Sequence, residues 1–314
     1  MIPDMSAQNR PILVTGAHRT GTTWVGKMLA SNGHFAYISE PLNVNHRPGF
    51  FQAKVRNWYT YIHEANEADY LPAFKNMLEF RYNLTSEIRS LRSGRDALRM
   101  GRDLESFITG KLRQKVPLIK DPFAVFSLNW FATRLNCQIV VTIRHPGGFA
   151  SSLKRLNWPF DFNDLLNQPD LMRDHLESYR TGIQVVSADD VIGQAGLLWI
   201  MIYGFVHAQR RLNPAIQVIR HEDLARDPIP CFRELFQKLG LEFNQKAHQA
   251  VLQSTGSDNP SELTETKTHS IKLDSRASAE NWKKRISSEE IDRLKKLTQT
   301  VSHIYYADSE WPAA

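Results

Sequence analysis

The chain has only two cysteines in 314 residues, Cys137 and Cys231, which lie far apart in mostly apolar surroundings. Such a pair does not form a disulfide framework and is typical of buried thiols in a reducing compartment. Residues 1–10 lack the basic start and the apolar stretch of a signal peptide. The longest apolar run, Leu197 to Val206, is too short to span a bilayer. We therefore expect a soluble, cytoplasmic protein without stable membrane insertion.

The sequence also lacks a long block of lysine and arginine, so it offers no arm for binding nucleic acid. Lysine and arginine nevertheless outnumber aspartate and glutamate by 39 to 33, which gives a net charge of +6. This excess predicts either a mildly basic surface in general or a site for a polyanionic cofactor. The composition is that of a globular protein, and the length suits one large α/β domain or two small ones.

A short run near the start of the chain predicts a phosphate-binding loop. Residues 12–14 suit a buried strand, Gly16 and Gly21 permit a tight turn, and helical spacing of apolar residues begins at Thr22. Backbone N–H groups in such a loop, together with the start of the following helix, favour a phosphate or a sulfate. Nucleoside-triphosphate loops place a lysine directly after the second glycine. Here Thr22 occupies that position, and the nearest cation is Arg19.

Charged residues also follow two other predicted strands. Residues 35–39 lead into Glu40, and residues 115–119 lead into Lys120. The carboxyl ends of strands in an open α/β sheet lie on the side where ligands bind, so Glu40 is the leading candidate for a general base. The alternative is a solvated glutamate that caps a turn. Lys120 either faces a sulfuryl or phosphate oxygen or pairs with Asp121 at the surface.

A second anion-binding motif follows the clearest buried strand, residues 138–143. Arg144 ends this strand, and Ser152 follows eight residues later in a predicted helix. A guanidinium that binds two oxygens and a hydroxyl that donates to a third suit a phosphate monoester. A strand-end arginine by itself is more often a surface ion-pair partner.

A third basic stretch, Asn-Trp-Lys-Lys-Arg at residues 281–285, follows a long polar loop. It predicts either a flexible basic linker or a segment that becomes ordered over an anion. Ser287 and Glu290 then form the pattern of a capping box, which predicts the start of the last helix.

In this order, the three motifs resemble those of the sulfotransferase family, whose members move a sulfuryl group from 3′-phosphoadenosine 5′-phosphosulfate (PAPS) to an acceptor. The resemblance implies a single α/β domain over residues 1–314, with three layers, a mostly parallel sheet of P-loop NTPase-like topology, and helical insertions. It implies PAPS as the co-substrate, no metal, and a small-molecule or glycan acceptor. The Ser-Glu-Pro run at residues 39–41 is closer to members that use a glutamate base, many of which sulfate carbohydrates or tyrosines, than to cytosolic members with a histidine base.

The resemblance also assigns roles to individual residues. Glu40 accepts the proton of the acceptor, with His34 as the reserve candidate, and Arg19 stabilises charge at the reacting group. Trp24 stacks on adenine, and Arg144 and Ser152 hold the 3′-phosphate together with Lys283. The residues implied to bind the co-substrate are Gly16, His18, Arg19, Thr20, Gly21, Thr22, Thr23, Trp24, Arg144, Ser152, Trp282 and Lys283.

Two long segments complete the expected domain. Residues 50–112 form a helical insertion, which in the family lines the acceptor pocket, and its aromatic residues are either acceptor contacts or ordinary core. Residues 254–285 form a loop that covers the co-substrate, in which Lys267 has an open role. Glu222 and Asp223 follow a late strand and serve as scaffold. The aromatic residues in question are Trp58, Tyr59, Tyr61 and Tyr82.

Two other functions compete with the interpretation as a sulfotransferase. One is a P-loop kinase of nucleosides or small molecules, and the other is a nucleotide-binding module without catalysis. The absence of lysine at Thr22 counts against the kinase, as does a second phosphate motif that a triphosphate does not require.

Overall fold

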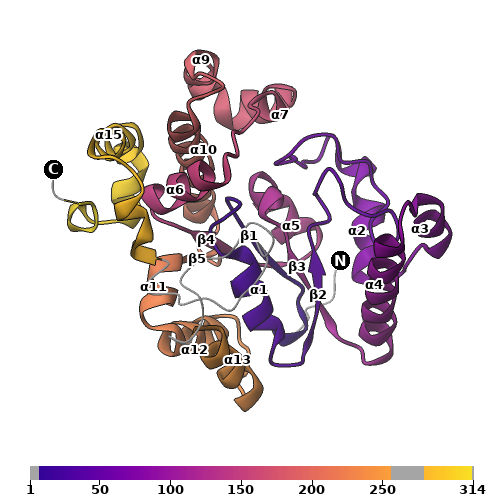
Figure 1. Ribbon diagram of the computed structural model, residues 1–314. Coiled ribbons are helices and arrows are strands. Elements are labelled where there is room, and N and C mark those ends of the chain that lie inside the picture. Colours follow the sequence, from indigo (N-terminus) through magenta and orange to yellow (C-terminus); the bar gives the residue numbers. More distant parts are fainter. Residues whose placement is uncertain (1–6, 256–278, 313–314) are drawn as a thin grey trace.

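The computed structural model describes residues 7–255 and 279–312. Within them, five strands form one parallel sheet in the order β2-β3-β1-β4-β5, with helices on its faces (Figure 1). The predicted α/β class with a parallel central sheet is therefore confirmed. The strands are β1 (Ile12–Gly16), β2 (Phe35–Ser39), β3 (Val116–Lys120), β4 (Gln138–Ile143) and β5 (Gln217–Arg220).

The register of the strands brings the predicted functional segments to one edge of the sheet. Gly16 at the end of β1 is aligned with Thr142 on β4, and Ser39 at the end of β2 is aligned with Lys120 on β3. Glu40 follows Ser39, and its backbone N–H donates to the carbonyl of Lys120 at 2.7 Å. The phosphate loop, the candidate base and the buried lysine thus all lie at the carboxyl edge of the sheet.

The two faces of the sheet bury two separate apolar cores. Along β1, Ile12 and Val14 face one core, and Leu13 faces the other, as the alternation of side chains in a strand requires. One core is covered by α1 (Thr22–Ala30), α12 (Pro228–Lys238) and α13 (Gln245–Thr255). The other contains side chains of η3 (Pro122–Ser127), α5 (Leu128–Arg134), α6 (Pro146–Leu156), α10 (Val191–Leu212) and α15 (Ser288–Tyr305).

The most apolar helix, α10, belongs to this second core. By length and composition it could cross a membrane, but 78% of its apolar window is buried inside the protein. It packs against α15 and α6, so its composition is explained by burial on all sides.

The insertion between β2 and β3 is helical only in its second part. Residues 51–66 contain turns and irregular backbone, whereas the predicted helical insertion was expected to begin at residue 50. The helices lie beyond β2 at the edge of the sheet (Figure 1). They are η2 (Glu67–Asp69), α2 (Leu71–Leu78), α3 (Leu84–Ser90) and α4 (Gly94–Leu112).

Shorter elements complete the chain. The predicted capping box is confirmed, because the Ser287 hydroxyl accepts from the Glu290 N–H and the Glu290 carboxylate accepts from the Ser287 N–H. Most of the expected co-substrate loop, including Lys267, lies outside the described residues. The remaining short elements are η1 (Ala7–Asn9), α7 (Asn163–Leu166), α8 (Pro169–Leu171), the π-helical turn η4 (Met172–Leu176), η5 (Glu177–Tyr179), α9 (Arg180–Val185), α11 (His221–Arg226), η7 (Asn281–Lys284) and η8 (Asp308–Glu310).

Candidate active site

The loop after β1 has a backbone that requires both of its glycines. Gly16 has a φ of 139°, and a Cβ there would lie 2.3 Å from the Thr142 carbonyl oxygen. Gly21 has a φ of 97° and directly precedes α1, whose first residue is Thr22. This is the strand, tight turn and helix start that the sequence predicted. The loop therefore presents the N-terminus of α1 at the carboxyl edge of the sheet.

Two tyrosine hydroxyls occupy the first N–H groups of the loop. The Ala17 N–H donates to the Tyr203 hydroxyl at 3.2 Å, and the His18 N–H donates to the Tyr59 hydroxyl at 3.1 Å. The Thr20 side chain is buried and donates to the Ala17 carbonyl at 2.6 Å. These groups fix the shape of the loop, so any anion must be bound by the later part, which runs from Arg19 into α1.

The ring of His18 is buried and hydrogen-bonded to Tyr59. The Tyr59 hydroxyl lies 2.5 Å from His18 Nδ1 and already accepts from the His18 backbone. A hydroxyl has one donor and two acceptor positions, so it suits either tautomer of His18: it donates to a bare Nδ1 or accepts a second time, from a protonated Nδ1. Burial, followed by the charge of Arg19, lowers the pKa of His18 to about 4. His18 is therefore a neutral hydrogen-bond donor at neutral pH.

Glu40 is part of an ion pair. One carboxylate oxygen pairs with the Lys120 ammonium, and the other accepts from the Asn43 amide at 2.9 Å. The Lys120 side chain is only 2% exposed, whereas that of Glu40 is 20% exposed. The interpretation of Lys120 as a surface partner of Asp121 was wrong: Lys120 pairs with Glu40, while the Asp121 carboxylate accepts from the Leu42 and Phe123 N–H groups. Register explains this, because Ser39 stands beside Lys120. Contact of Lys120 with a sulfuryl or phosphate oxygen stays a prediction.

The reserve base is not in the site. His34 precedes β2 and therefore lies at the amino edge of the sheet, opposite to Glu40. Its Nε2 is 2.7 Å from the Gln8 carbonyl oxygen. Its role is structural.

Three of the seven non-glycine residues with a positive φ in residues 7–255 and 279–312 lie at this edge of the sheet. Arg19, Glu40 and Tyr59 have φ values of 67°, 54° and 58°. Each such residue costs about 1–3 kcal/mol and persists only where the surrounding structure imposes it, which is common at active sites. For Tyr59, its two hydrogen bonds to His18 supply that constraint.

Four arginines converge next to the loop. Burial and then Arg144 and Arg155 lower the pKa of Arg19 to about 10. Burial also lowers the pKa of Arg144, and the charges of Arg285 and Arg155 lower it further. Burial likewise lowers the pKa of Arg285, and the charge of Arg155 adds to this effect. These guanidiniums repel one another, and this repulsion is relieved when an anion binds among them. We refer to Arg19, Arg144, Arg155 and Arg285 as the arginine cluster.

The structure brings the first and second phosphate motifs into contact. Arg19 Nε donates to the Ser152 hydroxyl at 3.2 Å, and Arg144 Nη1 is 3.4 Å from the Arg19 carbonyl oxygen. Glu222 supports this arrangement: it is near Arg144, and it accepts from the His145 N–H at 2.8 Å and the Tyr306 hydroxyl at 3.0 Å. The scaffold role predicted for Glu222 agrees with these contacts.

The third motif is anchored beside the second by its tryptophan. The Trp282 ring stacks on His145 at 4.6 Å between ring centroids, and a Cβ on Gly147 would lie 2.3 Å from it. Trp282 is buried, so its side chain holds the segment in place. Lys283 is exposed and pairs with Glu280 at 2.5 Å. Arg285 is the residue of this segment that reaches the arginine cluster.

Trp24 lies in the core beneath the loop. Its indole N–H donates to the Ser254 hydroxyl at 2.9 Å, and its ring is 8% exposed. The edge of His221 meets this ring at 5.7 Å between centroids, and His221 Nδ1 lies 2.9 Å from a Cβ built on Gly21. In the described part of the chain, neither ring nitrogen of His221 has a hydrogen-bond partner. Burial and then Arg144 lower the pKa of His221 to about 3.

The four aromatic residues proposed as acceptor contacts have different surroundings. Tyr59 lies at the loop, and Trp58 packs against Phe123 at 4.3 Å between centroids. Tyr82 packs on Phe107 in the helical part of the insertion. Of the four, Tyr59 is therefore tied directly to the predicted site.

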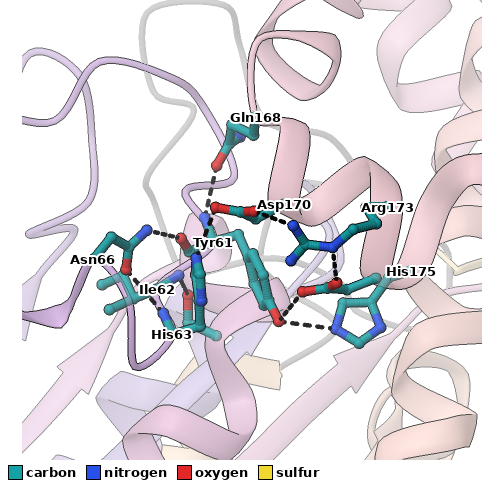
Figure 2. Close-up of polar contacts among 10 residues, drawn as sticks. Tyr61, Ile62, His63, Asn66, Gln168, Asp170, Arg173 and His175 are labelled. Carbon is teal, nitrogen blue, oxygen red and sulfur yellow. Dashed lines mark hydrogen bonds and ion pairs between the residues drawn. The ribbon is translucent and has the colours of Figure 1, made fainter.

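Tyr61 belongs to a separate polar cluster (Figure 2). Its hydroxyl lies 3.3 Å from an Asp174 carboxylate oxygen and 3.2 Å from His175 Nε2, and its ring stacks on His63. The cluster joins the insertion to the segment around η4 and holds the two together.

The sequence did not identify three features of this site. The sequence analysis assigned no role to Arg155 or His221, and it placed Arg285 only within the basic stretch 281–285. Arg155 lies three residues after Ser152, which is one turn of the same helix, and this spacing was the signal available for it. His221 directly follows β5 at the carboxyl edge of the sheet, as Glu40 follows β2.

No group of three or more histidine, cysteine, aspartate or glutamate side chains that could hold a metal occurs in residues 7–255 and 279–312. Among the same described residues, the buried or half-buried cations at the site are the arginines of the cluster and Lys120.

The fold and the site define an α/β protein with buried cations at the carboxyl edge of a parallel sheet. Residues 11–245 match the model of the sulfotransferase family. The chain therefore belongs to the sulfotransferase family, as the motifs predicted.

Solved structures of sulfotransferases share this fold. The sulfotransferase domain from the curacin biosynthetic pathway has 15% sequence identity and a TM-score of 0.51, over 94% of this chain and 97% of that chain. Sulfotransferase STF9 from Mycobacterium avium is less similar: it has 11% sequence identity and a TM-score of 0.48, over 97% of this chain and 79% of that chain. Mouse sulfotransferase SULT7A1 complexed with PAP gives 12% identity and a TM-score of 0.45, over 94% of this chain and 85% of that chain. No curated protein sequence matches the chain.

Proposed function

We propose that this sulfotransferase uses PAPS as its donor and transfers the sulfuryl group to a hydroxyl group of a carbohydrate or another small molecule. The observation that carries the proposal is the arginine cluster, in which Arg19 contacts Ser152 and Arg144 contacts the backbone of the loop at Arg19. A ligand with anionic groups at two separate positions suits this arrangement, because the loop and the cluster are two adjacent anion sites.

The residues present fit such a donor. The later part of the loop, with Arg19 and the start of α1, suits the phosphosulfate end. Arg144, Ser152 and Arg285 suit the 3′-phosphate, and Lys283 adds a nearby exposed charge. Desolvated cations with lowered pKa values indicate that the site is built for negative charge.

His221 and Trp24 provide a candidate position for the adenine of the donor beside the loop. The buried ring nitrogens of His221, next to Trp24, are suited to hydrogen bonds with a nucleobase. A histidine held neutral by burial offers both a donor and an acceptor for such bonds. Adenine stacking by Trp24 stays a prediction, since only a small part of that ring is exposed.

The chain's own residues supply the groups that the transfer requires. When bound, PAPS supplies the sulfuryl group and leaves as adenosine 3′,5′-bisphosphate (PAP). Glu40 accepts the proton of the acceptor hydroxyl, and the ion pair with Lys120 holds its carboxylate in place. Arg19 and the N–H groups at the start of α1 stabilise charge on the reacting group. Positioning and charge stabilisation supply most of the rate, as in phosphoryl transfer.

A P-loop kinase is the competing function, and calorimetric titration separates the two. We expect PAP to bind tightly without a metal and ATP with Mg²⁺ to bind weakly. Arg144→Gln should weaken PAP binding about 10- to 100-fold, the range for losing a charge-assisted hydrogen bond. Arg173→Gln, at an exposed arginine paired with Asp170 and Asp174, is the matched control and should leave PAP affinity unchanged. Tight binding of ATP with Mg²⁺ together with weak binding of PAP would overturn the proposal.

A further inference from the structure

Exposed apolar side chains occur on α3 and α4. These two helices lie at the edge of the molecule beyond β2 (Figure 1). Of the ten large hydrophobic side chains that are exposed in the described residues, five lie on these two helices. Among these five, the most exposed are Leu98 at 72% and Leu112 at 79%. Arg47 ties the helices together, since it pairs with Glu87 of α3 and with Asp96 of α4.

The segment that contains α3 and α4 carries nearly all of the excess positive charge of the chain. Residues 81–115 contain nine arginines and lysines against four aspartates and glutamates, so they account for five of the six net positive charges of the chain. Eight of the nine basic residues are exposed, but only one of the four acidic residues, Glu105, is exposed. Glu87 is buried, and Asp96 is half-buried beside Arg47.

The spacing along α4 places both kinds of side chain on its outer side. Leu98, Glu105 and Leu112 are seven residues apart and lie on one line along the helix, with Ile108 one turn before Leu112. Three exposed arginines flank this line at residues 95, 99 and 102. We refer to the exposed apolar and basic side chains of α3 and α4 as the basic apolar face.

We propose that the basic apolar face binds the surface of an anionic lipid bilayer. An amphipathic helix with arginines beside an exposed apolar stripe lies in the plane of the interface: its apolar side chains enter the headgroup region, and its cations bind lipid phosphates. Such binding is peripheral and involves no spanning segment. It is independent of the donor and the acceptor of the reaction.

Charge and composition favour this partner over others. A second copy of the chain would bring two strongly basic faces together, which is repulsive. Nucleic acid binding uses aromatic side chains for stacking, but the only aromatic residue among residues 84–112 is Phe107, which is buried. Five exposed aliphatic side chains have no use on a phosphate backbone, whereas a bilayer accepts both them and the arginines.

Co-sedimentation with vesicles tests the proposal. The full-length protein should bind vesicles of phosphatidylcholine mixed with phosphatidylglycerol and should not bind phosphatidylcholine alone, and added salt should weaken binding. Each arginine near an anionic surface contributes about fivefold, so the triple variant Arg95→Gln, Arg99→Gln, Arg102→Gln should lose about 100-fold in partition coefficient. The double variant Leu98→Ser, Leu112→Ser should also bind more weakly. Arg210→Gln with Arg211→Gln, at exposed arginines on α10, should bind like the wild type.

PAP titration and thermal unfolding of every variant separate loss of the lipid contact from loss of the fold. Equal binding to both kinds of vesicle, or full binding by the triple arginine variant, would refute the proposal. Self-association of the wild type that disappears in the double leucine variant would assign the face to a second copy instead. Because the vesicle assay uses no donor or acceptor, its result does not depend on the proposed reaction.

Discussion

Replacement of Glu40 by glutamine removes the proposed base while preserving the size of the side chain. The amide can still accept from a neighbour, as the carboxylate accepts from Asn43, but it cannot take the proton of an acceptor hydroxyl. General base catalysis contributes about 10²- to 10⁴-fold in rate. We therefore expect Glu40→Gln to lower the rate of sulfuryl transfer by this factor and to leave the affinity for PAP unchanged.

The same change should lower stability, because it removes the counter-charge of Lys120. Loss of one partner from a fully buried ion pair costs about 3–5 kcal/mol. The Lys120 side chain is 2% exposed, but that of Glu40 is 20% exposed, so water screens the pair in part. We expect the free energy of unfolding to fall by about 1–3 kcal/mol.

Single-turnover transfer from labelled PAPS, combined with denaturant unfolding and PAP titration, separates the catalytic loss from the structural one. Glu67→Gln is the matched control, since the Glu67 side chain is also 20% exposed and pairs with an arginine, Arg134, away from the site. It should lose stability but keep the transfer rate. Near-normal transfer by Glu40→Gln with intact PAP binding would refute the role of Glu40 as the base.

Three further predictions concern the loop and its neighbours. Tyr59→Phe removes the hydroxyl that is hydrogen-bonded to His18 Nδ1, so it should cost about 1–3 kcal/mol of stability. In ¹⁵N NMR of labelled histidine the Nδ1 shift of His18 should change as this hydrogen bond is lost, and an unchanged spectrum would contradict the contact. Arg285→Gln should weaken PAP binding about tenfold or more, whereas Lys283→Gln should weaken it less in the same titration. A larger loss of affinity for Lys283→Gln than for Arg285→Gln would show that Lys283 is the phosphate ligand. Burial lowers the pKa of His221 in the folded state from 6.5 to about 3. Below pH 6.5 the unfolded state therefore binds a proton at His221 that the folded state does not bind, and the free energy of unfolding decreases as the pH falls. In urea unfolding, the wild type should lose about 2 kcal/mol more than His221→Phe between about pH 7.5 and about pH 5, and equal losses would exclude a buried neutral histidine.

Local patterns in the sequence were enough to predict the strands and the loop. The β-branched run at residues 138–143 became β4, and the two glycines of the loop took backbone conformations that other residues rarely adopt. The capping box of the last helix also formed as predicted. These features depend on interactions within a few residues, which a sequence displays directly.

Contacts across the sheet were not predictable in the same way. The partner of Lys120 depends on the register between β2 and β3, and the pairing of His18 with Tyr59 depends on the path of an irregular segment. The arginine cluster draws its members from the loop, the end of β4, α6 and the residue after η7, so its convergence follows from tertiary packing. The sequence named Lys283 as a phosphate ligand, which stays a prediction, but it gave no sign that the charge of Arg285 acts on Arg144.

The acceptor proposed for this sulfotransferase is the part of its function that local geometry determines least. Tyr59 lies at the loop, whereas Tyr61 holds the insertion against the segment around η4. A panel of hydroxyl compounds that includes carbohydrates is therefore the appropriate set of acceptors.

The transfer reaction itself tests the central claim most directly. The purified protein is incubated with ³⁵S-labelled PAPS and this panel, in parallel with γ-labelled ATP and Mg²⁺. Our account predicts that label moves from PAPS to a hydroxyl acceptor, that one PAP forms for each sulfated product, and that Arg144→Gln abolishes most of the transfer. Transfer of phosphate from ATP, with no label moved from PAPS to any acceptor, would contradict it.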